Sequence, residues 1–498
     1  MNSPVLTGRT SDTALLTRAI WLLLPLLAAG GMGLVLGTVI AMDYGTLAVG
    51  MAEVLIYLLI AFLNPLAGLL FWIVTSPFSR HIFVDLDLGQ SVPDLNLSRL
   101  VPSILLVLVF AQAAARRRTL VWHKALDVLV LLAIIGIGQS VANSIGRSTA
   151  AMLFFDAYVV PFLAYFLAKN LVSEKTSIDR LVLSTMIVGL YVAALAINEA
   201  FTGVVLFDPG GDYPRMYSRN VRRLVSLLGH PAVSGAVLDL VIPLCLYALL
   251  TARSATGKAL YGLAVATMCV AVFLTFNRAS YFGLVFVFIA MALFSSPLRK
   301  ALIVLILVLG SLIGSQWNSI VASDVIRERL FWENPVEARV VLYPTSMNMF
   351  KQYPLLGIGF DNFRFFVPYY IVGLGDIPAE AGVGAPNPHN SFLYVLTSAG
   401  LLGVLPYAAI FLTIAAYSIR LLTAAKLVSS RRTLASSLLA VLGAYVITSS
   451  SQDVVYAITV SLVFFTIVGY ILAYLGRHAS VTSRPGLRRA SQLKGSML

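Results

Sequence analysis

One histidine stands where a polar loop meets a long apolar run, a position suited to a general base. His389 follows "GVGAPNP", and Asn387 or Asn390 can cap a helix that begins near Ser391. In the first turn of that helix the imidazole would feel the positive end of the helix dipole, which disfavours its protonated form. His389 would then be available to take a proton from a hydroxyl group. The alternative is an interfacial histidine that only forms local hydrogen bonds.

A cluster of arginines lies earlier in the chain. The stretch "YPRMYSRNVRRLVSLLGHP" carries Arg215, Arg219, Arg222 and Arg223 ahead of an apolar run. The planar guanidinium group suits phosphate because it donates paired, charge-assisted hydrogen bonds. We interpret Arg215 and Arg219 mainly as anchors at lipid headgroups. For Arg222 and Arg223, a bound anion and a headgroup anchor are both open.

Two further arginines extend this pattern. In "FLTFNRASYFGL", Arg278 lies between two apolar runs with almost no loop, so it must sit near membrane depth. Such a residue costs about 2.5–3.5 kcal/mol on insertion unless it lines a wet cavity or meets an anion. A tight turn in which Arg278 caps helix carbonyls is the alternative. Arg339 lies in a helical stretch of a long loop and could instead pair with Glu333 or Glu337.

Acidic residues offer a competing site. Asp85 and Asp87 form a D-x-D pair in an early loop, and such a pair can hold a divalent cation. Two short acids in a polar loop are commonplace, so the sequence predicts neither a metal nor a cofactor. Asp239 lies in the apolar run that follows Arg223 and could face the same cavity as that arginine.

The composition defines the elements that must position these groups. The chain has 498 residues, of which 59% are hydrophobic and only 11% charged, against about 25% charged in soluble domains. Apolar stretches of about 20 residues recur throughout, which predicts an all-α polytopic integral membrane protein. We expect about fourteen spans. They cover 19–42, 45–63, 64–78, 99–115, 125–145, 149–168, 181–200, 230–252, 258–276, 279–295, 300–316, 391–417, 433–450 and 454–476. The alternative for the second and third is one helix that is broken around Asn64-Pro65.

The distribution of charge predicts the orientation. Most Lys and Arg residues face the cytoplasm if both termini lie there, as the positive-inside tendency favours. The loop 317–390, which contains short helices, then faces outward with His389. We expect one transmembrane domain over 1–476 and a basic, disordered cytoplasmic tail over 477–498. The net charge of +13 therefore points to membrane lipids as partners rather than to nucleic acid.

Four pieces in a fixed order resemble the O-antigen ligase and polymerase superfamily of bacterial envelope glycosyltransferases. The resemblance covers about 200–410. The pieces are Arg223 ahead of "SLLGHP", "TFNRAS" around Arg278, "EARVVLY" and "PLLGIGFDNF" with Arg339, and His389-Asn390 followed by "SFLYVLTSAGLLG" with Gly400 and Gly403. Ser226 and Ala232 depart from the pattern of many members, which weakens any assignment to a subfamily.

The resemblance implies a C-type membrane glycosyltransferase. Its donor would be an undecaprenyl-pyrophosphate-linked glycan, used at the periplasmic face of the bacterial inner membrane in a metal-independent, inverting displacement. His389 would act on the acceptor hydroxyl, and Arg223 and Arg278 would hold the pyrophosphate, with Arg222 and Arg339 beside them. The supporting residues would be Asn390, Gly400, Gly403 and Asp239, the two glycines allowing close approach of a helix or a lipid tail.

The sequence leaves alternatives for the acceptor of the glycan and for the class of protein. The acceptor could be a lipid A core sugar, as in a ligase, or another lipid-linked glycan, as in a polymerase, with a protein as a smaller possibility. From another class, the chain could be a transporter or flippase of an anionic lipid-linked glycan. Transport predicts charges at several mid-membrane positions and pseudo-repeats. The cations cluster instead at the outer face, which favours chemistry there.

Overall fold

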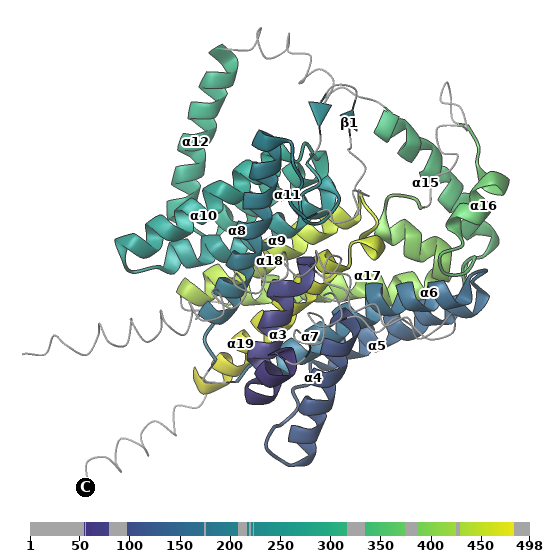
Figure 1. The fold of residues 1–498 in the computed structure, drawn as a ribbon, viewed down its shortest axis with the longest axis horizontal. Coiled ribbons are helices and arrows are strands. Elements are labelled where there is room, and N and C mark those ends of the chain that lie inside the picture. The colour runs from purple at the N-terminus through teal and green to yellow at the C-terminus, as the bar shows by residue number, and fades with distance from the viewer. Residues whose placement is uncertain are drawn as a thin grey trace, which may run out of the picture.

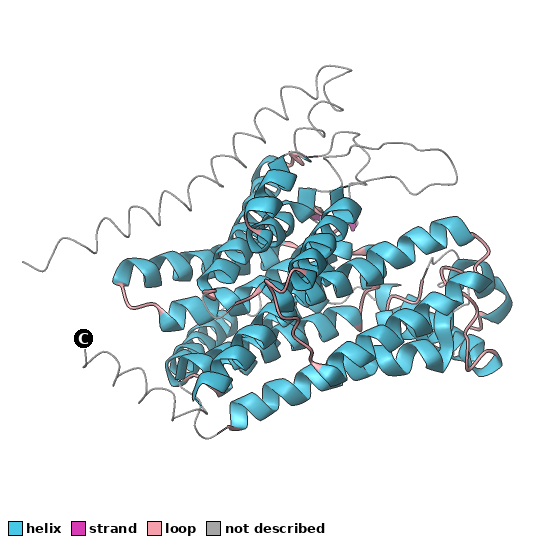
Figure 2. Cartoon of the chain, turned by 90° about the horizontal axis from the view of Figure 1, so that it is seen from below, coloured by secondary structure: helices cyan, strands magenta, loops and turns pink. Residues whose placement is uncertain are grey.

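The computed structural model is helical almost throughout (Figures 1 and 2). The only strands in the described part are β1 (Tyr217–Ser218) and β2 (Val221–Arg222), an antiparallel pair. The structure describes residues 54, 56–78, 97–173, 176–207, 217–218, 221–222, 224–315, 334–373, 387–424 and 429–482. The predicted span 19–42, the residues Asp85, Asp87 and Arg223, and most of the predicted tail lie outside these ranges.

The helices follow the predicted apolar runs closely. In chain order they are α3 (Pro65–Thr75), α4 (Leu97–Ala114), α5 (Lys124–Gly138), α6 (Arg147–Phe154), α7 (Val160–Leu171), α8 (Asp179–Thr202), α9 (Pro231–Thr251), α10 (Ala255–Leu274), α11 (Arg278–Leu293), α12 (Ser296–Ser315), α15 (Asn334–Gln352), α16 (Phe363–Tyr370), α17 (Ser391–Thr423), α18 (Ser429–Ser449) and α19 (Ile458–Thr482). The predicted break at Asn64-Pro65 is confirmed, since Asn64 caps α3 by accepting a hydrogen bond from the Ala67 N–H.

The predicted number of spans is not confirmed. Within the described residues, eight helical runs are long and apolar enough to cross a membrane, and three shorter apolar helices accompany them. One of the eight, Arg147–Leu171, joins α6 and α7 through a π-helical turn at Phe155–Val159. The class of fold, an all-α protein with several membrane-crossing helices, is as expected.

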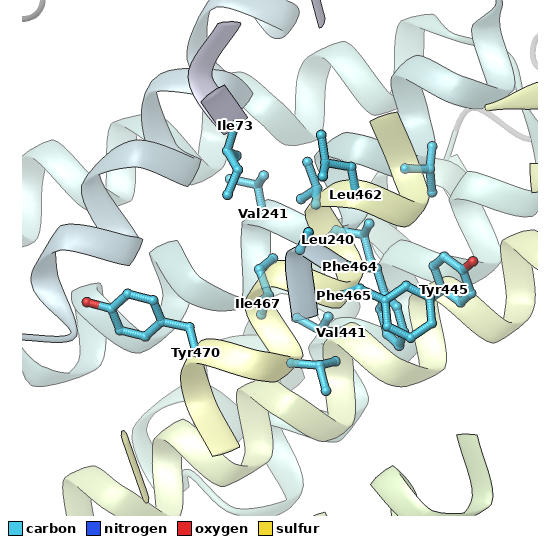
Figure 3. Packing of buried hydrophobic residues seen from close by; sticks show 14 of the residues in the cluster. Ile73, Leu240, Val241, Val441, Tyr445, Leu462, Phe464, Phe465, Ile467 and Tyr470 are labelled. Atoms are coloured by element: carbon cyan, nitrogen blue, oxygen red, sulfur yellow. The ribbon is translucent and has the colours of Figure 1, made fainter. Parts of the chain in front are cut away.

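Helices α9, α18 and α19 form the centre of the bundle. Leu240 and Val241 of α9, Tyr445 of α18 and Phe464 of α19 belong to one buried cluster, part of which Figure 3 shows. The Tyr445 and Phe464 rings stack with centroids 4.0 Å apart. The Tyr445 hydroxyl lies 2.9 Å from Ser461 Oγ, so the ring satisfies its polar atom while burying its apolar body.

Two acids form ion pairs inside the bundle. Arg99 of α4 donates from Nε and Nη2 to both oxygens of Asp156, at 2.9 and 2.7 Å. Lys169 of α7 pairs with Asp127 of α5, which also accepts a hydrogen bond from Tyr165 at 2.9 Å. Such pairing is what allows charged groups to sit among membrane helices.

Helix α17 is interrupted at Gly400, whose φ of 62° and ψ of −157° are not helical. At the break the chain hydrogen-bonds to Pro354–Gly359, the segment that precedes α16. The Leu401 N–H donates to Pro354 O at 2.9 Å, and the Ile358 N–H donates to Thr397 O at 2.8 Å. The segment therefore satisfies groups that the break would leave orphaned.

The two predicted glycines differ in what they contact. A Cβ on Gly400 would lie 2.4 Å from the Leu355 carbonyl, so Gly400 admits the loop segment rather than a helix or a lipid tail. Gly403 faces α5, where a Cβ on Gly136 would lie 2.0 Å from Leu402 O. Gly403 thus lies at a contact between helices, whereas Gly400 contacts the backbone of the loop segment at Leu355.

We expect Gly400→Ala to lower the free energy of unfolding by about 3 kcal/mol, because the backbone conformation is strained for alanine and the new methyl overlaps Leu355. Thermal unfolding in detergent micelles measures the change. Gly146→Ala is the matched control, since its φ is −104° and no atom lies within 4 Å of the added Cβ. Equal losses in the two variants would show that the break does not depend on glycine.

Candidate active site

His389 lies immediately before the helix that the sequence predicted. Asn390 is the N-cap of α17, and its Oδ1 accepts hydrogen bonds from the Phe392 and Leu393 N–H groups at 3.0 and 3.1 Å. Asn387 instead accepts from the His389 N–H at 3.1 Å. His389 thus precedes the cap rather than lying in the first turn.

The backbone of His389 adopts a left-handed conformation, with φ of 52°. Such values are uncommon for residues other than glycine and are found disproportionately at functional sites. The hydrogen bonds of Asn387 and Asn390 on either side hold this conformation. The side chain is half-buried, so the imidazole has restricted solvent access while remaining open to a ligand.

Electrostatic effects connect this histidine to one arginine directly and to a second arginine through the first. Burial lowers the pKa of His389, and the positive charge of Arg339 on α15 lowers it further. Burial likewise lowers the pKa of Arg339, with opposing effects from Tyr343, which raises it, and Arg278 at the start of α11, which lowers it. Electrostatic interactions therefore link Arg278 to Arg339 and Arg339 to His389. Both effects on His389 favour the neutral imidazole, the form that a general base requires.

The turn between α18 and α19, Ser450–Ala457, holds the elements that carry these groups. The Ser450 carbonyl accepts hydrogen bonds from Asn390 Nδ2 at 3.0 Å and from the Tyr343 hydroxyl at 3.2 Å. The Ser451 carbonyl accepts from Arg339 Nη2 at 2.9 Å. The start of α17 and the helix α15 are thus tied to one short piece of backbone, which limits how far Arg339 and His389 can move apart.

Ser391 strengthens this attachment. Its Oγ donates to Gln452 O and accepts from the Val454 N–H, both at 3.0 Å. The serine is fully buried, so both hydrogen bonds are shielded from water. They place Asp453, the residue between these two partners, against the chain that carries His389.

Asp453 is a residue that the sequence reasoning missed. Its carboxyl group is buried and faces the backbone N–H groups of His389 and Asn390, without a hydrogen bond of regular geometry in the described part of the chain. Burial raises its pKa to about 8, although the two N–H groups lower it. The carboxyl group is therefore mostly protonated at pH 7. The sequence could have indicated Asp453, because it is an acidic residue in "SSQDVVYA", a short connection between two apolar runs.

The remaining predicted site residues are only partly placed. Asp239 is fully buried in α9 at its contact with α11, where a Cβ on Gly283 would lie 2.5 Å from Oδ2. Arg222 is the β2 residue paired with Tyr217, but its side chain lies outside the described residues, as does all of Arg223. The roles of these three residues in the site stay predictions.

The chain that follows Arg223 is firmly held. The Ser226 N–H donates to Glu199 Oε2 at 2.7 Å, and Ser226 Oγ donates to Val192 O at 3.2 Å. His230 then caps α9 through Nδ1, which accepts from the Ala232 N–H at 3.2 Å. Glu199 and Val192 both belong to α8, so the start of α9 is fixed to that helix.

Across the described residues, no group of three His, Cys, Asp or Glu side chains could hold a metal ion.

The influence of Arg339 on His389 predicts a shift in pH dependence. Transfer by a neutral base should fall at low pH, with a midpoint below about 6.5, the usual histidine value. Arg339→Gln removes the positive charge, so the pKa of His389 should rise and the acid limb should move to higher pH. Arg339→Lys keeps the charge and should leave the limb in place. The pH profile of kcat/KM decides, and an unmoved limb in Arg339→Gln would contradict the coupling.

The described residues thus form a bundle with several helices apolar enough to cross a membrane, in which the charge of Arg339 acts on a half-buried histidine. Residues 263–408 match the model of the O-antigen ligase family. The match confirms the resemblance seen in the motifs over this part of the chain, and the helices that are apolar enough to cross a membrane agree with it. The matched residues include Arg278, Arg339 and His389, whereas the α18–α19 turn lies beyond them. No curated protein matches the chain.

Proposed function

We propose that the protein transfers a glycan from an undecaprenyl-pyrophosphate carrier to an acceptor hydroxyl, at the outer face of the bacterial inner membrane. The observation that carries this proposal is the electrostatic linkage of Arg278, Arg339 and His389 within the residues that match the O-antigen ligase family. Guanidinium groups suit the diphosphate, and the imidazole suits the hydroxyl proton.

The chemistry follows from these assignments. The acceptor O–H gives its proton to His389 while the oxygen forms a bond to the anomeric carbon of the donor sugar. The bond from that carbon to the pyrophosphate oxygen breaks, and the leaving group keeps the electron pair. Arg278 and Arg339, together with Arg222 and Arg223, would stabilise the charge that develops there. A single displacement of this kind inverts the anomeric configuration.

Burial strengthens each of these contributions. Arg339 and His389 are both partly removed from water, so the charge of Arg339 acts through a lower effective dielectric than bulk solvent offers. The hydrogen bonds to Ser450 and Ser451 hold Asn390 and Arg339 before any substrate arrives. Preorganised groups lose little orientational freedom during the reaction, which is the main advantage of such a site.

Reconstitution with a lipid-linked donor tests the proposal and separates its versions. The full chain in nanodiscs receives an undecaprenyl-pyrophosphate oligosaccharide and either lipid A core or a second lipid-linked oligosaccharide. Product on lipid A core indicates a ligase, and a lengthened lipid-linked chain indicates a polymerase. NMR of the new linkage should show inversion. A protein that moves the donor across proteoliposomes without forming a bond would be a transporter, which would contradict the proposal.

A further inference from the structure

The segment Pro354–Gly359 exposes two adjacent leucines although its backbone is well fixed. The side chains of Leu355 and Leu356 are 61% and 46% exposed, whereas Ile358 is buried. The Leu355 carbonyl accepts a hydrogen bond from the Leu402 N–H at 3.3 Å, and the Leu356 carbonyl accepts one from Gln139 Nε2 at 3.3 Å. The leucines are therefore held outward by structure rather than left in a loose loop.

Helix lengths give the level of this segment relative to the membrane. α5 runs 15 residues from Lys124 to Gly138, next to Gln139, which is about 22 Å at 1.5 Å per residue. Leu401–Thr423, the part of α17 after the break, is about 35 Å long by the same measure. The hydrocarbon core is about 30 Å thick. The two lengths fall on either side of this thickness, so with the far ends of the helices at one boundary of the core, the segment lies near the other boundary.

The exposed leucines continue the outward faces of the two spans that hold them. Ile135 of α5 is 58% exposed and Leu405 of α17 is 61% exposed, and both lie on helices apolar enough to cross a membrane. Such faces are covered by lipid in a membrane protein. The segment is hydrogen-bonded to these same helices, so the same lipid is within reach of Leu355 and Leu356.

Helix α16, which follows the segment, has the character of an interfacial helix. Phe363 and Val367 face inward and are buried, whereas Tyr369 is 83% exposed. The Arg364 guanidinium lies over the Phe365 ring, 4.8 Å from its centroid. Exposed aromatic rings and a flanking arginine are typical of residues at the boundary between lipid and water.

We propose that Leu355, Leu356 and the exposed face of α16 are inserted into the lipid at the membrane boundary. The loop that carries the candidate site is then partly a membrane-embedded element, and its lipid partner is the region between acyl chains and headgroups. If the proposed function also holds, this insertion sets the height of Arg339 and His389 relative to the pyrophosphate of a lipid-linked donor. The insertion itself does not depend on that function.

Spin-label accessibility tests the insertion directly. Cys245 and Cys269, the two native cysteines, are replaced by alanine, and Leu356→Cys is labelled with a nitroxide in the full chain in nanodiscs. We expect collisions with oxygen to exceed those with a water-soluble nickel complex by several fold. Lys351→Cys, at the exposed end of α15, is the matched control and should show the opposite order.

Two outcomes would overturn the inference. Dominant collisions with the nickel complex at Leu356 would place it in water, and protection from both reagents would place it under protein. Leu355→Cys gives a second reading if the first variant does not fold. The same measurement on His389→Ala separates this inference from the proposed function, because the label depth should not change when transfer is lost.

Discussion

Replacing His389 with alanine is expected to reduce glycan transfer by a factor of about 10²–10⁴, the range for loss of a general base. The reason is that burial and the charge of Arg339 lower the pKa of His389, which favours the neutral imidazole that can accept the proton. Without the imidazole, the proton of the acceptor hydroxyl must be transferred to water. The measurement is single-turnover transfer from a lipid-linked donor to an acceptor sugar by protein reconstituted in nanodiscs.

The matching control is His389→Gln, which keeps polarity and approximate size but cannot accept a proton at neutral pH. We expect it to be as inactive as the alanine variant, with an unfolding temperature close to that of the unmodified protein. Donor binding should persist in both variants because the arginines remain. Transfer at the original rate by either variant would remove His389 from the reaction.

Arg278→Ala is the second change for which we expect a large loss, about 10²–10³-fold, comparable to removing one donor from an oxyanion site. Arg278 begins α11 and interacts electrostatically with Arg339. Its loss removes charge where the pyrophosphate would leave. Arg278→Lys should recover only part of the rate, since the charge is kept but the paired donors of the guanidinium are not.

A surface arginine provides the comparison for this second change. Arg364 is exposed, and its contacts are a 3.5 Å ion pair with Asp361 and the neighbouring Phe365 ring, so Arg364→Ala should leave transfer within about twofold, as expected of a weak surface pair. Donor binding, followed by retention of a fluorescent pyrophosphate lipid, should weaken in Arg278→Ala and not in Arg364→Ala. Equal transfer rates in these two variants would show that Arg278 has no special part.

Much of the helical framework could be predicted, because a membrane helix must satisfy its backbone within one apolar run. The start of α17 was also accessible, since Asn390 is a strong N-cap residue placed directly ahead of that run. The number of spans was harder. The sequence predicted the continuous helical run Arg147–Leu171, which contains a π-helical turn, as a single span. Short apolar helices such as Arg278–Leu293 do not by their length decide whether they cross the membrane.

The parts of the site that sequence reasoning missed depend on contacts between distant segments. The break at Gly400 exists because a loop some 40 residues earlier in the chain supplies its hydrogen bonds, which no local pattern reveals. The α18–α19 turn acts through the backbone carbonyls of Ser450 and Ser451, and every residue type has such a carbonyl. Asp453 went unnoticed for the related reason that its neighbours are backbone N–H groups rather than charged side chains.

The place of the α18–α19 turn in the chain has a consequence for biosynthesis. The turn lies near the C-terminal end, so the ribosome delivers it after every other described element of the site. Until the final hairpin of helices inserts, Arg339 and Asn390 lack the carbonyls that hold them. A chain cut short before Ser450 would thus enter the membrane with its family domain complete but its reactive groups unaligned, and an unfinished product would be inert.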